Sequence, residues 1–177
     1  MDTNQLAKMI AGEAISPYQS EYFNRANARY TCTLENFLSG TSRSGAPNII
    51  FEFSVLHSDG EGANRKGVDT KIIYSTESWN LKKIKTHLMH ILQVGVEVMN
   101  DPEQGALLVG QALEAREDRD GKSVLSGTPV LVTTTLENSE ARRNEGKSDY
   151  VVYRIEKITE ESCPTEWKLY QANKTPF

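Results

Sequence analysis

Lysine and arginine side chains gather in the predicted turns and at one predicted helix start of this 177-residue chain. Cations that converge on a groove neutralise the phosphates of a nucleic acid, and aromatic rings beside them stack on unpaired bases. The cationic candidates are Arg43, Arg65, Lys66, Lys71, Lys82, Arg142, Arg143 and Lys147, and the aromatic candidates are Tyr74, Trp79 and Tyr153. These residue types predict one concave cationic strip, flanked by unburied rings, that binds a single strand. The alternative for each residue is an ordinary role, as a solvated surface charge or a core ring.

Patterns for catalysis or metal binding are weak. His87 and His90 are three residues apart on a predicted helix, but no Cys, Asp or Glu lies near them at ligand spacing. Cys32 lies in an alternating strand pattern, where a small buried residue is the expected role. No phosphate-binding glycine motif is present. The sequence therefore predicts a protein that is not an enzyme and uses neither a cofactor nor a metal.

Composition constrains the setting. The formal net charge is −4, which argues against a general basic coat but leaves room for a local basic groove. Only two cysteines are present, as expected for reduced thiols in a reducing cytoplasm. No window approaches the ~18 apolar residues of a membrane-spanning helix, and the acidic N-terminus does not resemble a secretory signal. We expect a cytoplasmic protein, in the host cell if it is viral, with no membrane partner.

Hydrophobic periodicity predicts the elements that must position these residues. Alternation with period two predicts strands over 29–38, 48–56, 68–75, 128–136 and 149–158. Spacing of three and four predicts helices over 78–99 and 102–115, with Ser78 and Asp101 as their N-caps. Phe51 and Phe53 share the apolar phase of their strand and are expected in the core.

The order of these elements favours a mainly β, α+β fold. Five strands with helices between the third and fourth match an OB-fold, a five-stranded antiparallel barrel. The alternative is an open five-stranded sheet with a helix covering one face. We predict an N-terminal leader with a short helix over 1–27, an OB-fold-like domain over 28–158 with its helical insertion at 78–116, and an irregular C-terminal tail over 159–177.

Two stretches carry a family resemblance. One comprises residues 28–38 with 45–55, and the other is 125–133. The matching positions are Thr41, Gly45, Pro47, Ile49, Phe51 and Val55, then Leu125, Gly127, Pro129, Val130 and Val132. This pattern resembles bacteriophage single-stranded DNA-binding-like proteins of the OB-fold type, from replication and recombination modules, over residues 28–158. The resemblance implies binding without strong sequence preference, and self-association into homo-oligomers.

The last two residues, Pro176 and Phe177, resemble the C-terminal end of single-stranded DNA-binding proteins that dock replication or recombination partners, although no acidic run precedes them. The sequence thus leads to a hypothesis of a single-stranded DNA-binding protein in phage DNA replication or recombination, with RNA left open as a ligand. The alternative is a non-enzymatic protein-interaction or structural module of a phage.

Overall fold

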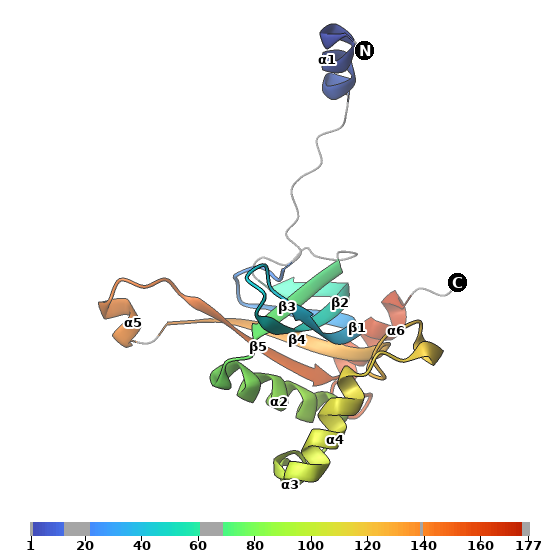
Figure 1. The fold of residues 1–177 in the computed structure, drawn as a ribbon, viewed down its shortest axis with the longest axis vertical. Coiled ribbons are helices and arrows are strands. Elements are labelled where there is room, and N and C mark those ends of the chain that lie inside the picture. Colours follow the sequence, from blue (N-terminus) through green and yellow to red (C-terminus); the bar gives the residue numbers. More distant parts are fainter. Residues whose placement is uncertain (1, 13–21, 61–68, 139, 175–177) are drawn as a thin grey trace.

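A computed structural model describes residues 2–12, 22–60, 69–138 and 140–174. Its five strands form one antiparallel sheet in the order β3-β2-β1-β4-β5. The strands are β1 (Ala28–Thr41), β2 (Pro47–Gly60), β3 (Asp69–Ser75), β4 (Thr128–Glu137) and β5 (Tyr150–Lys157). Between β3 and β4 lie the helices α2 (Ser78–Leu92), α3 (Val96–Asn100) and α4 (Pro102–Leu113), followed by the short 3-10 helix η1 (Glu117–Arg119). This confirms the predicted α+β class and the helical insertion (Figure 1).

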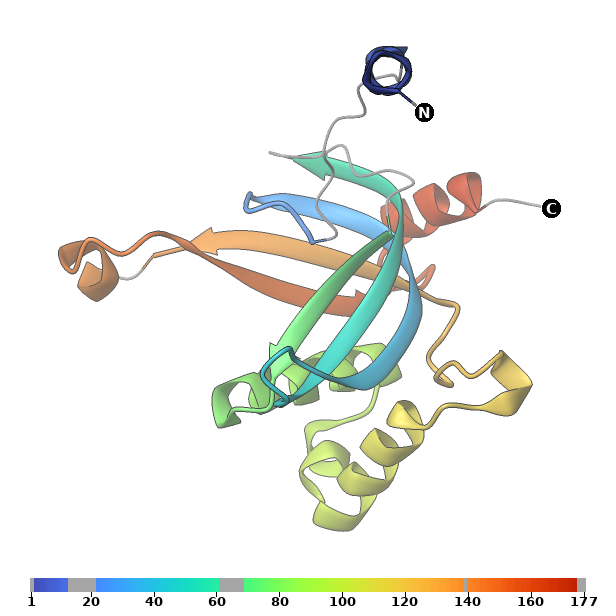
Figure 2. The same ribbon diagram turned by 45° about the horizontal axis from the view of Figure 1, so that its top comes forward.

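The predicted closure into a barrel is wrong, and the alternative of an open sheet is correct. The order β4-β1-β2-β3 is that of a Greek key, with β5 added beside β4, so β3 and β5 remain as the two edges. The sheet curves strongly, but α2 lies across its concave side and packs against both edge strands (Figure 2). Because the helix fills the space between β3 and β5, these strands do not pair with each other.

Two long strands, β1 and β2, form the centre of the sheet. Alternate residues point to the concave side, where Cys32, Leu34, Phe51 and Phe53 are buried, as their period-two pattern predicts. The pairing register shifts at two places along β1, between Thr31 and Cys32 and again after Leu34. Such bulges bend a strand locally and increase its twist, which accounts for the curvature around α2.

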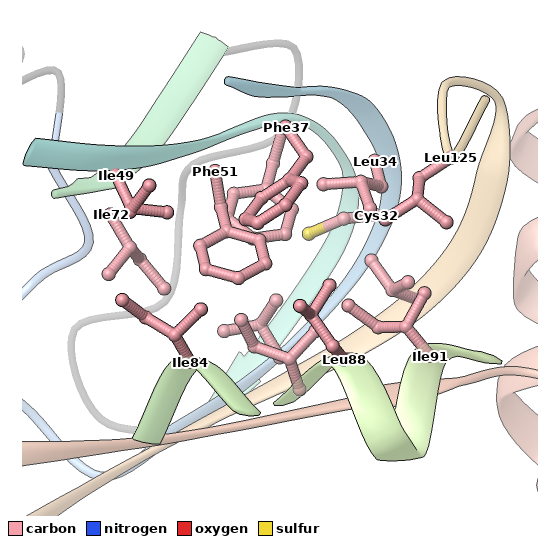
Figure 3. Close-up of a cluster of buried hydrophobic side chains, with 14 of the residues drawn as sticks. Cys32, Leu34, Phe37, Ile49, Phe51, Ile72, Ile84, Leu88, Ile91 and Leu125 are labelled. Atoms are coloured by element: carbon pink, nitrogen blue, oxygen red, sulfur yellow. The ribbon is translucent and has the colours of Figure 1, made fainter. Parts of the chain in front are cut away.

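The main core lies between the concave face and α2. Phe51 and Cys32 from the sheet face Ile84, Leu88 and Ile91, which share one side of the helix (Figure 3). The helix ends at Gln93, whose φ of 54° is left-handed, so the apolar stripe does not continue in one helix to residue 99 as predicted. Its N-cap is Glu77, without a side-chain cap bond, rather than the predicted Ser78.

The second predicted cap is confirmed. The Asp101 carboxylate accepts hydrogen bonds from the amides of Glu103 and Gln104, at 3.0 and 2.9 Å, and Pro102 occupies the first turn of α4. This geometry satisfies two backbone donors that a helix start otherwise leaves unpaired.

The opposite face of the sheet carries a helix where an irregular tail was predicted. Helix α6 (Pro164–Asn173) packs on this face beside β1 and β2. Cys163, at the helix start, lies in a small cluster with Leu131 and Ile158, and Glu166 pairs with Arg29 of β1. The apolar residues of α6 are only weakly segregated to one side of the helix, so hydrophobic periodicity did not predict this helix. None of the helices in the described part of the chain has the length and apolar character needed to cross a membrane.

The predicted leader contributes to the core. It contains α1 (Thr3–Gly12), none of whose residues is buried. Phe23, however, is buried, with its ring centroid 4.7 Å from that of Tyr30 and 5.5 Å from that of Phe53. Phe23 therefore belongs to the folded domain, although it precedes β1.

We predict that Phe23→Ala lowers the free energy of unfolding by about 3–5 kcal/mol, because it leaves a cavity among aromatic rings. Urea denaturation monitored by circular dichroism measures the change. The exposed Lys8→Ala in α1 is the control and should stay within about 0.5 kcal/mol of the wild type. Equal stability of the Phe23→Ala variant and the wild type would contradict the assignment of Phe23 to the core.

Candidate nucleic-acid interface

The structure places the expected cations at two opposite ends of the sheet rather than along one strip. Arg43 lies in the β1–β2 turn, which the pair Thr41–Pro47 closes. Ser75 pairs with Asn48 beside this turn, so α2 starts at the same end (Figure 2).

The β4–β5 connection lies at the other end, because the pairing partner of Thr134 is Ala28, the first residue of β1. The fourteen residues of β1 span about 45 Å along the strand at the usual rise. Arg43 and Lys82 are therefore remote from Arg142, Arg143 and Lys147.

Two of the three predicted cations of the β4–β5 connection have local partners, and the third, Arg143, is exposed. This connection projects from the sheet and carries the short helix α5 (Glu140–Asn144) (Figure 1). The Arg142 guanidinium donates to the Ser148 carbonyl oxygen at 2.9 Å and lies 5.0 Å from the ring centroid of Tyr150. Lys147 pairs with Glu145 at 2.7 Å. Three acids and three basic residues between 138 and 150 give this segment a formal charge of zero, so it attracts phosphates weakly.

Lys71 lies among carboxylates. Its side chain faces away from the core, into a pocket of about 450 Å³ on the outward side of β2 and β3. Glu35, Glu52 and Asp69 line the same pocket, together with Lys122. The ammonium also lies 5.9 Å from the centroid of the Tyr22 ring. Because three carboxylates surround two lysines, this pocket repels a phosphate more than it attracts one.

Two of the three aromatic candidates belong to the core. Tyr74 is only 6% exposed, and its hydroxyl lies 2.8 Å from Nε2 of His87. Burial raises the pKa of Tyr74 well above its usual value. Tyr153 is half-buried, 6.2 Å from the Phe23 ring centroid, and burial raises its pKa as well. The interpretation of Tyr74 as a stacking platform is therefore wrong, and Tyr153 presents only part of its ring.

The third aromatic candidate is different. Trp79 is 59% exposed in the first turn of α2, on the side opposite to the buried Ile84 and Leu88. Lys82 and Lys83 follow it by three and four residues, so all three side chains share one helix face. We call this set, Trp79 with Lys82 and Lys83, the α2 outer face. Lys83 was not among the predicted candidates, although its spacing of four from Trp79 is the signal that identifies it.

Charge on α2 is of one sign. Between Ser78 and Leu92 the sequence has three lysines and neither Asp nor Glu. The third lysine, Lys85, turns to another side and donates to Asn100 Oδ1 at 2.6 Å. The β1–β2 turn at the same end of the sheet adds Arg43 and also has no acidic residue between Thr41 and Pro47. Glu77, the N-cap of α2, is the one acid next to this helix start in the sequence, so this end of the molecule combines an exposed indole with an excess of cations.

Three arginines outside the predicted set lie near the base of the β4–β5 connection. Arg25 donates to the carbonyl oxygen of Asp149, Arg29 pairs with Glu166, and Arg154 lies 3.6 Å from Glu156. Since each has an oxygen partner within the protein, we assign these arginines a structural role.

Several predicted residues are not placed. Arg65, Lys66, Pro176 and Phe177 lie outside the described residues. Within the described ranges, no group of three or more His, Cys, Asp or Glu side chains is arranged to hold a metal ion. The His87 ring packs against Tyr74 and Phe51, so it does not form a pair of ligands with His90. Comparisons with models of known protein families and with curated protein sequences find no match.

The buried Tyr74–His87 pair generates a pH prediction. Burial, with smaller effects of His90 and Lys83, lowers the pKa of His87 from 6.5 to about 4. Below pH 6.5 the unfolded chain therefore takes up a proton that the folded chain does not, so stability falls between pH 6.5 and 4. This group should remove about 2 kcal/mol of unfolding free energy between pH 7 and pH 5.

Urea denaturation at both pH values measures this loss. The double variant Tyr74→Phe with His87→Phe removes both polar partners and should show a loss smaller by about 2 kcal/mol. His57→Gln, on β2, is the control and should keep the wild-type difference. An unchanged pH dependence in the double variant would show that His87 is not the responsible group.

Proposed function

We propose that this protein binds single-stranded DNA without catalysis, in phage DNA replication or recombination. The α2 outer face, together with Arg43, is the proposed contact surface. The observation that carries the proposal is the exposed Trp79, one helical turn from Lys82 and Lys83, on a helix that contains no acidic residue. This surface is better supported than the strip expected from sequence, because Tyr74 is buried and both Arg142 and Lys147 have partners within the β4–β5 connection.

The chemistry of the surface fits an unpaired strand. An exposed indole stacks on any base, which contributes roughly 1–3 kcal/mol per base and requires no particular sequence. Lys83 follows Trp79 by about 6 Å along the helix axis, which is four residues at the usual rise, so its ammonium reaches phosphates near the stacked base. A duplex hides the faces of its bases, so we propose a preference for single strands.

The acidic balance of the chain does not oppose this proposal. Six carboxylates lie between α3 and β4, and none of them belongs to α2: Asp101, Glu103, Glu114, Glu117, Asp118 and Asp120. Two of these, Glu117 and Asp118, belong to η1. With Lys82, Lys83 and Arg43 as the phosphate contacts, the logarithm of affinity should fall with the logarithm of salt with a slope of about −2.

A second candidate function is a protein-interaction module. The observation that favours it is a mostly apolar groove between α2 and α4, on a different side of α2 from Trp79. This module would bind a helix and no polynucleotide.

Fluorescence anisotropy of labelled oligothymidine, starting at ~50 mM salt, tests the proposal. Trp79→Ala, and separately Lys82→Glu with Lys83→Glu, should each weaken binding about tenfold or more, because each removes stacking or phosphate contacts. Arg142→Glu with Arg143→Glu makes the same charge change at the remote β4–β5 connection and is the matched control. We expect it to bind within about twofold of the wild type.

Circular dichroism should show that all variants stay folded, because every substituted side chain is exposed or half-buried. Absence of binding by the wild type at low salt would overturn the proposal and favour the protein-interaction module. A loss of binding confined to the Arg142 and Arg143 variant would instead move the site to the β4–β5 connection.

A further inference from the structure

A groove of about 440 Å³ opens between α2, α4 and the end of the sheet where β1 meets β2. Apolar side chains form most of its wall, chiefly Leu81, Ile84, Leu88, Met99, Val109 and Leu113. Leu81 is 47% exposed in the single chain. We call this cavity the α2–α4 groove. An exposed apolar groove of this size usually marks a binding site.

The same chain carries an exposed apolar helix face. In α1, Leu6, Met9 and Ile10 recur at spacings of three and four and so lie on one side of the helix. Their exposed fractions are 49%, 57% and 68%, and no residue of α1 is buried. Figure 1 shows α1 apart from the sheet and its helices. A helix of ten residues is only marginally stable alone, so a packing partner would stabilise it.

We propose that the α2–α4 groove binds α1 of a second copy of this chain. In a helix-in-groove interface, a few apolar side chains on one face of an amphipathic helix insert into an apolar groove, and α1 offers three such side chains. Both the groove and this face of α1 are mainly apolar, and the groove residues Leu81 and Val109 are at least partly exposed. Among the described residues, α1 buries none of its side chains, and the groove offers the apolar wall that such a helix face would contact.

Exchange between two copies favours the second chain as the occupant. If each chain inserts α1 into the other, two identical contacts form around a two-fold axis, and the assembly closes as a dimer. The buried area is then twice that of one helix contact, which brings it nearer to the ~1,200 Å² of stable interfaces. Within one chain, α1 lies beyond the opposite end of the molecule from α2 and α4 (Figure 1).

The proposed dimer is independent of nucleic-acid binding. Trp79, Lys82 and Lys83 are not among the residues that line the groove. The α2 outer face therefore stays open when α1 docks, and the Trp79→Ala variant should still dimerise. Failure of one proposal can thus be distinguished from failure of the other.

Sedimentation equilibrium over a range of concentrations tests the oligomeric state of the full chain. We expect the mass to rise from the 19.8 kDa of one chain to twice that value. Leu6→Glu with Ile10→Glu should abolish this rise, because carboxylates do not enter an apolar groove. Lys8→Glu, on the other side of α1, is the control and should keep it. A monomer at every concentration, or a dimer that persists in the Leu6 and Ile10 variant, would overturn the proposal.

Disulfide trapping identifies the contact itself. Mixing a Met9→Cys protein with a Val109→Cys protein under mild oxidation should give a covalent dimer on a non-reducing gel. The native Cys32 and Cys163 are buried and should not interfere. Leu107→Cys on α4 does not line the groove and should give far less product. A chain carrying both Met9→Cys and Val109→Cys that links only to itself would overturn the second copy as occupant.

Discussion

The arrangement of this protein depends on the uneven pairing of its central strand. β1 is hydrogen-bonded to β2 along its whole length, but to β4 only from Ala28 to Leu34. At Leu34 and Asn36 the segment before β4 contacts that edge: the Ser123 amide donates to the Asn36 side-chain oxygen at 2.9 Å, and the Gly127 amide donates to the Leu34 carbonyl oxygen at 2.8 Å. The β1–β2 turn and the β4–β5 connection are consequently fixed at opposite ends.

A second consequence concerns α2. The concave face must be covered because Cys32, Leu34 and Phe51 point into it, and α2 covers it with Ile84, Leu88 and Ile91. Because α2 buries the side that carries Ile84 and Leu88, its opposite side faces solvent. That exposed side contains Trp79. The same packing leaves Leu81 at the edge of the α2–α4 groove. One helix thus separates the two proposed binding surfaces.

Local patterns predicted much of the fold. Alternation in Ile49, Phe51 and Phe53 identified β2 and its buried face, and Asp101 with Pro102 identified the start of α4. Such features depend on neighbours in the chain. Closure of the sheet into a barrel depends instead on whether the edge strands β3 and β5 pair with each other. Helix α2 lies between them and contacts both, and this long-range packing cannot be read from a short stretch of sequence. The burial of Phe23 and the packing of α6 are likewise long-range effects.

The candidate site was predictable only in part, for the same reason. Trp79 and Lys82 were predicted because an aromatic residue and a lysine both lie at the predicted helix start, and the structure places them on one face of α2. Tyr74 is as good an aromatic candidate as Trp79 in the sequence. In the structure, however, its position on β3 directs the ring into the core, where its hydroxyl hydrogen-bonds to His87. Arg142 and Lys147 are basic in sequence, while their partners Ser148 and Glu145 emerge only when the connection folds.

Intrinsic tryptophan fluorescence during an oligothymidine titration tests the central claim most directly. The chain has two tryptophans, so Trp167→Phe leaves Trp79 as the only emitter. We predict that oligothymidine quenches this emission in a saturable way and that added salt reverses the quenching, because a base stacks on the indole. Trp79→Phe, which reports from the half-buried Trp167, should show little quenching. Saturable binding that leaves the Trp79 emission unchanged would contradict the account.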